Sequence, residues 1–343
     1  MRGDRSGLCL IVAVHSTVLG QAVGGCRLWH YGDWRDALDD ALRLSEAMTL
    51  KCSLSGLPHG GGKAVIALPE DRVLSNPQRR DAFLDLGDLV ESFGGLYGTA
   101  EDVGTTAEDM LVVRERTQYA YCLPPSSGGA GEPSEPTAIG VHAAIRAVAR
   151  RLFGTETLRD RTVGIIGLGQ VGSRVARRIR HDGASLVVTD TDPAKRSLGN
   201  ELGAQWVEPE SSLGMNVDIL IPAALGGVFT ASSINDLKCS AVIGPANNQL
   251  AADDVADLFL ERGILWAPDF VVNAGGAIYG AIVDVGGGDP AEAMRRVEAI
   301  GDTLDDILDI SDREGVTPYQ AAVRLAHDRI EAARAGRRAE LVH

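Results

Sequence analysis

Two lysines in the segment 48–68, MTLKCSLSGLPHGGGKAVIAL, are the first residues whose type and setting suggest chemistry. Of the 33 lysine and arginine residues in the chain, only Lys51, Lys63, Lys195 and Lys238 are lysines. An arginine keeps its proton at working pH, whereas a desolvated lysine can lose its proton near neutral pH and act as a base. We therefore expect Lys63 to be catalytic, with Lys51 nearby; the alternative is a pair of surface lysines that flank a turn.

Three glycines, residues 60–62, come directly before Lys63, and the apolar run AVIAL follows it. Because glycine has no side chain, this run predicts a loop where a ligand can approach the backbone. The apolar residues predict a buried strand over 64–68 that holds the base of Lys63 rigidly.

Glu101 and Asp102 are the candidate acids in the same half of the chain. Thr105 and Glu108 have the T-x-x-E spacing of a capping box, which predicts a helix start and places both acids in the loop before it. Asp102 could exchange a proton with a substrate, or it could be a carboxylate that the helix dipole favours. The residues alone leave both interpretations open.

The elements that must position these residues can be outlined from the pattern. Residues 8–14 and 18–23 predict strands, and the glycine pair that follows predicts close approach of a ligand or of another strand. Asp33 predicts the start of an amphipathic helix that delivers Lys51 at or just past its C-terminal end. The helix dipole also favours a cation there, which is the purely structural explanation for Lys51.

The segment 162–190 contains, in order, a strand, G-x-G-x-x-G, a helix, a strand and an acid, which together strongly indicate dinucleotide binding. Gly167 permits the tight turn, Gly169 lets the backbone approach a pyrophosphate, and Gly172 lets helix and strand pack closely. Asp190 would accept hydrogen bonds from the adenosine ribose and repel a 2′-phosphate, so the pattern predicts NAD rather than NADP.

Asn248 and Asn273 follow two later apolar segments of this half, which are expected to be strands near 241–243 and 264–266, as is 217–221. Their uncharged amides both donate and accept hydrogen bonds, which suits a ribose, a carboxamide or an amino group. The alternative is that each amide caps a turn. The last helices are expected over 291–314 and 317–335.

Composition narrows the class of protein. A net charge of −14 and a pI near 4.9 argue against binding to nucleic acid or to an anionic membrane. An odd number of cysteines, five, without a C-x-x-C pair predicts neither a disulfide framework nor a zinc site, and a cytoplasmic location is expected. The segment 124–136, rich in proline, glycine and serine, predicts a linker with a domain boundary near Gly131.

Eight segments together resemble the glutamate/leucine/phenylalanine/valine dehydrogenase family, in that family's order and over nearly the whole chain. They are GGCR, MTLK, LPHGGGK, TAEDVGT, GGAG, GLGQVG, ANNQL and APDFVVNAGG. The resemblance implies an N-terminal α/β substrate domain and a C-terminal Rossmann dinucleotide-binding domain, with a cleft between them. Residues 1–130 would bind substrate and carry catalysis, 131–316 would bind NAD, and 317–343 would return to the first domain.

The resemblance also implies roles for individual residues. Lys51 would bind the substrate carboxylate, Lys63 would activate water and hold the 2-oxo oxygen, and Asp102 would shuttle the amino-group proton. The expected substrate contacts are Lys51, Gly25, Met48, Ala100, Asn273, Ala277 and Gly280. The expected cofactor contacts are Thr137, Gly167, Gly169, Gln170, Val171, Gly172, Asp190, Thr191, Ala246, Asn248 and Asn273, and no metal is expected.

The implied reaction is the reversible conversion of an L-amino acid, NAD⁺ and water to a 2-oxo acid, ammonia and NADH. The positions that the resemblance places in the substrate pocket, Ala100, Ala277 and Gly280, are small or apolar here. They indicate an apolar substrate side chain, and the room they leave favours an aromatic over a branched one. The alternatives are a reductive aminase or imine reductase acting on an unusual oxo acid, and a catalytically silent NAD-binding relative. A homo-oligomer, dimeric or larger, is expected. Cys26 and Pro245 depart from the family's usual residues.

Overall fold

The computed structural model of the chain describes residues 1–224 and 226–340, with side chains described up to residue 336. The chain divides into two compact units. Unit 1 consists of Met1–Pro133, Gly280–Pro290 and the residues from Ala326 on, and unit 2 consists of Ser134–Tyr279 and Ala291–Leu325. The chain first passes from unit 1 to unit 2 after Pro133, close to the boundary expected near Gly131. The C-terminal segment belongs to unit 1 from Ala326 on, rather than from residue 317.

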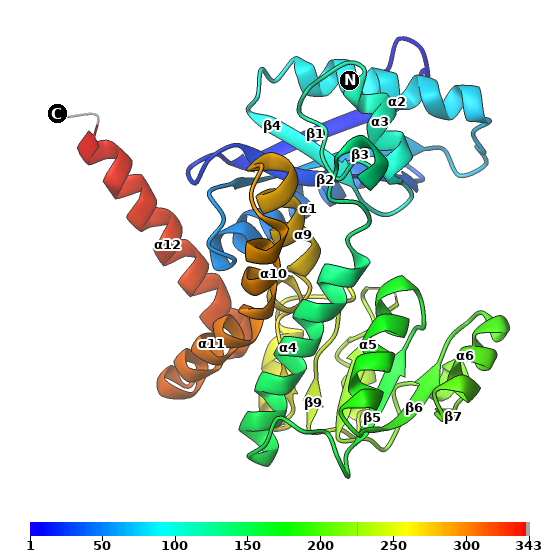
Figure 1. Cartoon of the computed structure of the whole chain (residues 1–343), viewed down its shortest axis with the longest axis vertical. Coiled ribbons are helices and arrows are strands. Elements are labelled where there is room, and N and C mark those ends of the chain that lie inside the picture. Colours follow the sequence, from blue (N-terminus) through cyan, green and yellow to red (C-terminus); the bar gives the residue numbers. More distant parts are fainter. Residues whose placement is uncertain (225, 341–343) are drawn as a thin grey trace. The chain divides into compact units, whose positions relative to one another are not determined.

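Where there is room, Figure 1 labels the helices and strands by their order in the chain. The strands are β1 (Cys9–Ser16), β2 (Ala22–His30), β3 (Gly60–Leu68), β4 (Tyr97–Glu101), β5 (Thr162–Ile166), β6 (Ser185–Thr189), β7 (Gln205–Trp206), β8 (Ile219–Pro222), β9 (Ala241–Val242) and β10 (Leu265–Trp266). The helices are α1 (Trp34–Leu54), α2 (Asn76–Glu91), α3 (Ala107–Arg114), α4 (Ser134–Phe153), α5 (Gln170–His181), α6 (Arg196–Glu201), α7 (Val255–Glu261), α8 (Asp269–Val272), α9 (Gly275–Gly280), α10 (Pro290–Glu298), α11 (Ile300–Glu314) and α12 (Pro318–Glu340).

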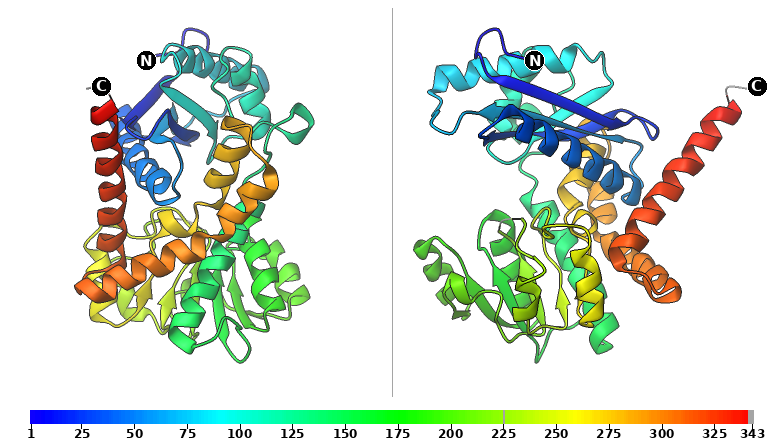
Figure 2. Two further views of the ribbon diagram at one scale, coloured as in Figure 1. Left: turned by 60° about the vertical axis from the view of Figure 1, so that its left-hand side comes forward. Right: turned by 180° about the vertical axis from the view of Figure 1, so that it is seen from behind.

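Unit 1 is built on a four-stranded sheet in the order β1-β3-β2-β4, in which β1 is antiparallel to β3 and the other neighbours are parallel. Helix α1 covers one face of this sheet, and α2 and α3 cover the other, as the right-hand view of Figure 2 shows. Because β2, β3 and β4 are parallel, their carboxyl ends lie at the same edge of the sheet.

Side chains along β3 alternate between these two faces, as strand geometry requires. Ala64, Ile66 and Leu68 belong to the core that α2 and α3 complete. Val65 and Ala67 instead pack with residues of α1. Lys63, at the position before Ala64, therefore belongs to the α1 face of the sheet.

The glycines of unit 1 lie inside strands, so two expectations were wrong: that a strand ends at Val23 and that residues 60–62 form a loop. Neighbouring elements come closer to these glycines than any side chain allows. A Cβ on Gly61 would lie 2.1 Å from the backbone nitrogen of Thr49 in α1, and a Cβ on Gly62 would lie 2.6 Å from the ring of Tyr97. The pair at 24–25 likewise marks the approach of another strand, because a Cβ on Gly24 would lie 1.8 Å from the carbonyl oxygen of Gly62.

Two further boundaries in unit 1 differ from the expectation by one or a few residues. The capping box of α3 is formed by Thr106 and Asp109, not by Thr105 and Glu108. Glu101 is the last residue of β4, so only Asp102 lies in the loop before the helix. The hydroxyl of Thr105 is used instead inside that loop, as described below.

Unit 2 contains a six-stranded parallel sheet in the order β10-β9-β8-β5-β6-β7. Counted from the first strand of the unit, this is the 3-2-1-4-5-6 order of a Rossmann fold, with its switch point between β5 and β8. The expected strands 162–166 and 185–189 and the helix ending at His181 agree with β5, β6 and α5. The expected helix over 291–314 is instead two helices, α10 and α11, and Gly315 ends α11 in a left-handed conformation.

No helix in the described part of the chain is both long and apolar enough to cross a membrane.

Candidate active site and cofactor site

Lys63, within β3, and Asp102, directly after β4, meet across the intervening strand β2. The ammonium nitrogen Nζ of Lys63 lies 2.7 Å from Oδ2 of Asp102. The side chain of Lys63 is only 6% exposed and that of Asp102 only 18%. The structure therefore brings together the two residues that the sequence analysis selected as catalytic, in a setting with little water.

A third charged group touches the same carboxylate. Nε of Arg27, on β2, donates to Oδ2 of Asp102 at 3.4 Å. Burial raises the pKa of Asp102, but the positive charges of Lys63 and Arg27 lower it by more, so the pKa is below its usual value. Asp102 is thus ionised in this arrangement, next to two cations.

The loop that carries Asp102 is fixed by one hydroxyl. Oγ1 of Thr105 accepts a hydrogen bond from the backbone N–H of Asp102 at 2.8 Å and donates to the carbonyl of Cys26 at 3.0 Å. This hydroxyl ties the loop to β2, the strand that also carries Arg27. The sequence analysis gave Thr105 the different role of capping a helix and therefore missed this one.

Glu101, the other candidate acid, points away from this site. It precedes Asp102 in an extended segment, so its side chain lies on the opposite face of the sheet, near the start of α3. Burial and the nearby carboxylates of Glu132 and Glu108 raise its pKa to about 7. Its Oε1 atom is buried without a hydrogen-bond partner.

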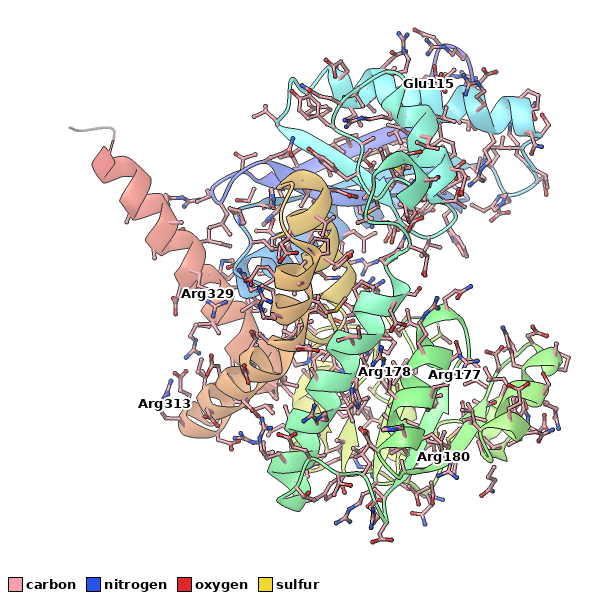
Figure 3. All side chains as sticks on the ribbon, viewed as in Figure 1. Glu115, Arg177, Arg178, Arg180, Arg313 and Arg329 are labelled. Carbon is pink, nitrogen blue, oxygen red and sulfur yellow. The ribbon has the colours of Figure 1, made fainter. Side chains whose placement is uncertain are left out.

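Lys51 lies in the last turn of α1, as expected, and is half-buried. The end of this helix is held by α12. Arg329 donates to the carbonyl oxygens of Ser53 and Leu54, at 3.3 and 2.8 Å, and Oγ of Ser53 donates to the carbonyl of Ala326 at 2.8 Å. Figure 3 labels Arg329 on α12. A segment distant in sequence thus stabilises the helix end that carries Lys51.

Three further positions expected to contact substrate lie in unit 1 and are all partly accessible: Gly25, Met48 and Ala100. Gly25 pairs with Ala100 across β2 and β4. A Cβ on Gly25 would lie 2.7 Å from Cβ of Asp102, so a glycine is required beside this carboxylate.

The glycine-rich turn of unit 2 has the geometry that the sequence predicted. Gly167 has a φ of +102°, and a Cβ on Gly172 would lie 2.1 Å from the carbonyl oxygen of Gly167. Gly169 differs from both, because no atom lies within 4 Å of a Cβ built on it. Its backbone is exposed at the N-terminus of α5, where peptide N–H groups and the helix dipole favour a phosphate.

Asp190 joins this turn to the end of β6. Its Oδ2 accepts a hydrogen bond from the backbone N–H of Leu168 at 2.6 Å, and its Oδ1 accepts one from the N–H of Asp192 at 2.8 Å. The carboxylate is half-buried and therefore remains partly accessible, while Thr191 beside it is exposed. Of the flanking positions expected to contact cofactor, Gln170 is exposed and Val171 is half-buried, both in the first turn of α5.

The loop after β9 carries a group of amides. Nδ2 of Asn273 donates to Oδ1 of Asn247 at 2.8 Å and to the carbonyl of Pro245 at 3.2 Å. Oδ1 of Asn273 is buried without a hydrogen-bond partner, so one acceptor is left for a ligand. Asn248 has a φ of +52°, which supports its alternative role as a turn residue, and Ala246 is buried.

Gln249 organises this loop and was missed by the sequence analysis. It is fully buried, and its amide donates to the carbonyls of Gly244 and Ala246, at 2.8 and 3.1 Å. Its Oε1 accepts a hydrogen bond from the indole N–H of Trp266 at 3.1 Å. The segment ANNQL showed this glutamine, but nothing local in the sequence indicated that it is buried.

Three expected site residues lie where the chain enters α4 and around α9. Oγ1 of Thr137 accepts a hydrogen bond from the backbone N–H of Gly276 at 3.1 Å. Ala277 is half-buried in unit 2. Gly280 is buried in unit 1, where a Cβ would lie 3.0 Å from Sγ of Cys122, so it packs against that cysteine.

The residues of unit 2 fit a dinucleotide. The open backbone at Gly169 suits a pyrophosphate, the carboxylate of Asp190 suits ribose hydroxyls, and the unpaired Oδ1 of Asn273 suits an amide or amino donor. In residues 1–224 and 226–340, no group of three or more His, Cys, Asp or Glu side chains could hold a metal ion.

Together, the Rossmann sheet with its glycine turn and the buried Lys63–Asp102 pair define a dinucleotide-dependent oxidoreductase. Comparisons with known proteins identify the family within this class. The Glu/Leu/Phe/Val dehydrogenase dimerisation domain matches residues 7–119, and the Glutamate/Leucine/Phenylalanine/Valine dehydrogenase domain matches residues 188–336. The chain belongs to this family of NAD-dependent amino-acid dehydrogenases, which act on CH–NH₂ groups.

Individual relatives cover nearly the whole chain. Leucine dehydrogenase of Bacillus subtilis (strain 168) is 40% identical over 97% of this chain and 91% of its own. Phenylalanine dehydrogenase of Caldalkalibacillus thermarum (strain TA2.A1) is 37% identical over 95% of this chain and 88% of its own. The crystal structure of L-tryptophan dehydrogenase from Nostoc punctiforme superposes with a TM-score of 0.82 at 34% identity, covering 98% of this chain and 96% of that one.

Proposed function

We propose that the protein catalyses the reversible oxidative deamination of an apolar L-amino acid with NAD⁺. In the balanced reaction, the amino acid, NAD⁺ and water give the 2-oxo acid, an ammonium ion, NADH and a proton. The observation that supports this best is the 2.7 Å contact between Lys63 and Asp102, whose side chains are only 6% and 18% exposed. An ion pair with little solvent around it can exchange protons with a bound substrate at modest cost.

Each residue of unit 1 would have a separate task. Lys51, a cation at the end of α1, would bind the substrate carboxylate. Asp102 would take a proton from the substrate ammonium, which must become a neutral amine before its Cα–H bond can break. Lys63, which must first release its own proton to solvent as substrate binds, would then deprotonate the water that adds to the resulting iminium, and would hold the oxygen of the 2-oxo product. The reverse reaction uses the same groups in the opposite order.

The residues of unit 2 would hold NAD, which accepts a hydride from Cα of the substrate when it is bound. The backbone at Gly169 would receive the pyrophosphate, and Asp190 would bind the ribose hydroxyls. Asn273 and Thr137 would position the nicotinamide end. Turnover requires that the two units bring their ligands together, which would also exclude water from the reacting groups.

The substrate side chain is expected to be apolar. The expected pocket positions Ala100, Ala277 and Gly280 carry no charge and little volume. The named relatives act on leucine, phenylalanine and tryptophan, so their names do not choose between an aliphatic and an aromatic side chain. The small residues favour an aromatic one, and this remains a prediction.

A rate measurement tests the proposal. Purified protein is supplied with NAD⁺ and with leucine, valine, phenylalanine or tryptophan, and the absorbance of NADH is followed; glutamate is the charged control. We expect the highest kcat/KM with one of the apolar amino acids, and turnover in the reverse direction with its oxo acid and ammonium. NADH binding without turnover on any of these substrates would instead indicate the catalytically silent relative, and turnover confined to an unusual oxo acid would indicate the reductive aminase.

The protein is also proposed to be a homo-oligomer. The support is that residues 7–119 match a domain described as the dimerisation domain of the family. Light scattering should give a mass of at least twice the 36.2 kDa of one chain. A monomer at micromolar concentration would contradict this part of the proposal. A cytoplasmic location stays a prediction.

A further inference from the structure

Behind the catalytic carboxylate lies a chain of charges that the proposed reaction does not use. Arg27 contacts Asp102 through Nε, and its other end reaches α1, where NH1 donates to Oδ2 of Asp40 at 2.8 Å. Asp40 is itself held by two more donors. The hydroxyl of Tyr31 donates to its Oδ2 at 2.7 Å, and NH2 of Arg43 donates to its Oδ1 at 2.6 Å.

The inner part of this chain is shielded from solvent. The side chains of Arg27 and Asp40 are 15% and 14% exposed, close to the 18% of Asp102. Arg43, at the outer end, is 52% exposed. Charges that are desolvated to this degree interact more strongly than surface pairs, because the effective dielectric constant around them is lower. The positive charge of Arg27 therefore interacts strongly with the carboxylate of Asp102.

We propose that Arg27, held in place by Asp40, is a positioning residue that keeps the carboxylate of Asp102 ionised while Lys63 gives up its proton. This inference rests on the proposed function, in which Lys63 and Asp102 exchange protons with the substrate. When Lys63 becomes neutral, Asp102 loses the cation at 2.7 Å and would attract a proton. Arginine cannot lose its own proton, so Arg27 supplies a positive charge that does not change during the cycle.

The other groups around Asp102 do not provide this charge. From β3 the carboxylate faces Lys63, and from β2 it faces Arg27 and the thiol of Cys26. From β4 it is sensed by the phenol of Tyr97. Burial raises the pKa of both Cys26 and Tyr97, so both are neutral in the working range of pH. Helix α1 contributes Asp40, which acts on Asp102 through Arg27.

Two substitutions in this chain of charges should shift the pKa of Asp102 in opposite directions. Arg27→Met removes the positive charge, so the pKa of Asp102 should rise, by about 1–3 units for a cation at this range. Asp40→Asn keeps the shape and the acceptor oxygen but removes a negative charge, so the charge of Arg27 is less compensated and the pKa of Asp102 should fall. A purely structural role for the two residues predicts damage of the same kind in both variants.

The experiment measures kcat/KM against pH in the full-length protein, with NAD⁺ and the best apolar amino acid. We expect the acid limb, where Asp102 takes up a proton, to move to higher pH in Arg27→Met and to lower pH in Asp40→Asn. Arg27→Lys should restore most of the wild-type limb. Arg80→Met is the matched control, because Arg80 forms an exposed pair with Glu115 at 2.7 Å, whose position on the surface of unit 1 is labelled in Figure 3.

A second readout does not depend on turnover. The carboxyl ¹³C signal of Asp102, assigned with Asp102→Asn, is titrated in the same variants without cofactor or substrate. The inference would be overturned if the acid limb of the pH profile and the titration midpoint of the ¹³C signal stayed at their wild-type pH. It would also be overturned if both moved in the same direction in Arg27→Met and Asp40→Asn. If the wild type has no dehydrogenase activity, the proposed function fails, and the titration still decides whether Arg27 controls the charge of Asp102.

Discussion

Two glycine-rich segments lie next to the proposed chemistry, and they serve opposite purposes. In unit 1, residues 60–62 are buried within β3, and added side chains would collide with β1, α1 and Tyr97. In unit 2, Gly169 of the turn before α5 is exposed, and an added side chain would meet no protein atom. The first set of glycines lets the protein pack against itself, and the second leaves space for a ligand.

The difference shows how the two units divide the work. Unit 1 brings a lysine and an aspartate into a contact with little solvent exposure by packing the strand around Lys63 on all sides. Unit 2 leaves backbone groups accessible at the carboxyl edge of its sheet. If this division is right, changes at the first set should affect folding and proton transfer, and changes at the second should affect cofactor affinity. The following predictions test the division, from the largest expected effect to the smallest.

Lys63→Ala should lower kcat by about 10²–10⁴-fold, the usual contribution of a general base, while NADH affinity stays within a few-fold of the wild type. Steady-state rates and a fluorescence titration with NADH measure the two effects separately. Lys238→Ala, a change at an exposed lysine of unit 2, is the matched control and should leave kcat unchanged. Equal turnover in wild type and Lys63→Ala would remove Lys63 from the mechanism.

Gly61→Ala should lower the free energy of unfolding by about 1–3 kcal/mol, because its Cβ would lie 2.1 Å from a backbone nitrogen of α1. Gly169→Ala should leave that free energy unchanged and weaken NADH binding instead. Urea unfolding measures the free energy of unfolding, and NADH titration measures cofactor affinity; both are done on both variants. Gly214→Ala is the control for stability, since the nearest atom to its Cβ lies 3.7 Å away. If both glycine variants lost stability to the same degree, the contrast between the two segments would disappear.

Asp190→Ala should weaken NAD⁺ binding and shift the preference between NAD⁺ and NADP⁺ toward NADP⁺ by about tenfold, which corresponds to about 1.4 kcal/mol. The physical reason is the loss of a carboxylate that binds ribose hydroxyls and repels a 2′-phosphate. The ratio of the two kcat/KM values measures the shift. Because Asp190 also accepts from Leu168 and Asp192, Asp190→Asn serves as the variant that keeps an acceptor without the charge. Unaltered discrimination in both would mean that another group selects the cofactor.

Glu101→Gln should stabilise the protein above about pH 7 and have no effect near pH 4, with a gain on the order of 1 kcal/mol after solvent screening. The folded-state pKa is raised to about 7 from an ordinary 4.5, so between these values the folded state holds a proton that the unfolded state has lost. Stability therefore falls as pH rises through this window, and an uncharged amide removes the fall. Urea midpoints at both ends of the window measure it. A gain of equal size at both ends would contradict the titration of Glu101.

The parts of the molecule that the sequence predicted well are those whose signals are local. The turn from Gly167 to Gly172, the strands on both sides and the acid at 190 all lie within one short segment, and each residue type there has one structural reason. Lys63 and Asp102 were selected by a rare residue type and by a family resemblance. Their contact could not be predicted from spacing alone, because it depends on β2 lying between β3 and β4.

What the sequence did not show depends on packing between distant segments. The glycines before Lys63 were assigned to a loop because the approach of Thr49 and Tyr97 leaves no trace in the local pattern. Arg27 and Asp40 are on a strand and a helix, and their ion pair follows only from the packing of α1 against the sheet. Gln249 is polar and was given no role, yet it is fully buried with every polar atom of its side chain bonded.

The hydrogen bonds from Arg329 to the last carbonyls of α1 have a consequence for truncation of the chain. A chain clipped before Ala326 keeps the local cap of α1 at Ser55 but loses these hydrogen bonds beside the lysine assigned to the carboxylate. Such clipping should loosen the helix end that carries Lys51 without touching any reacting group.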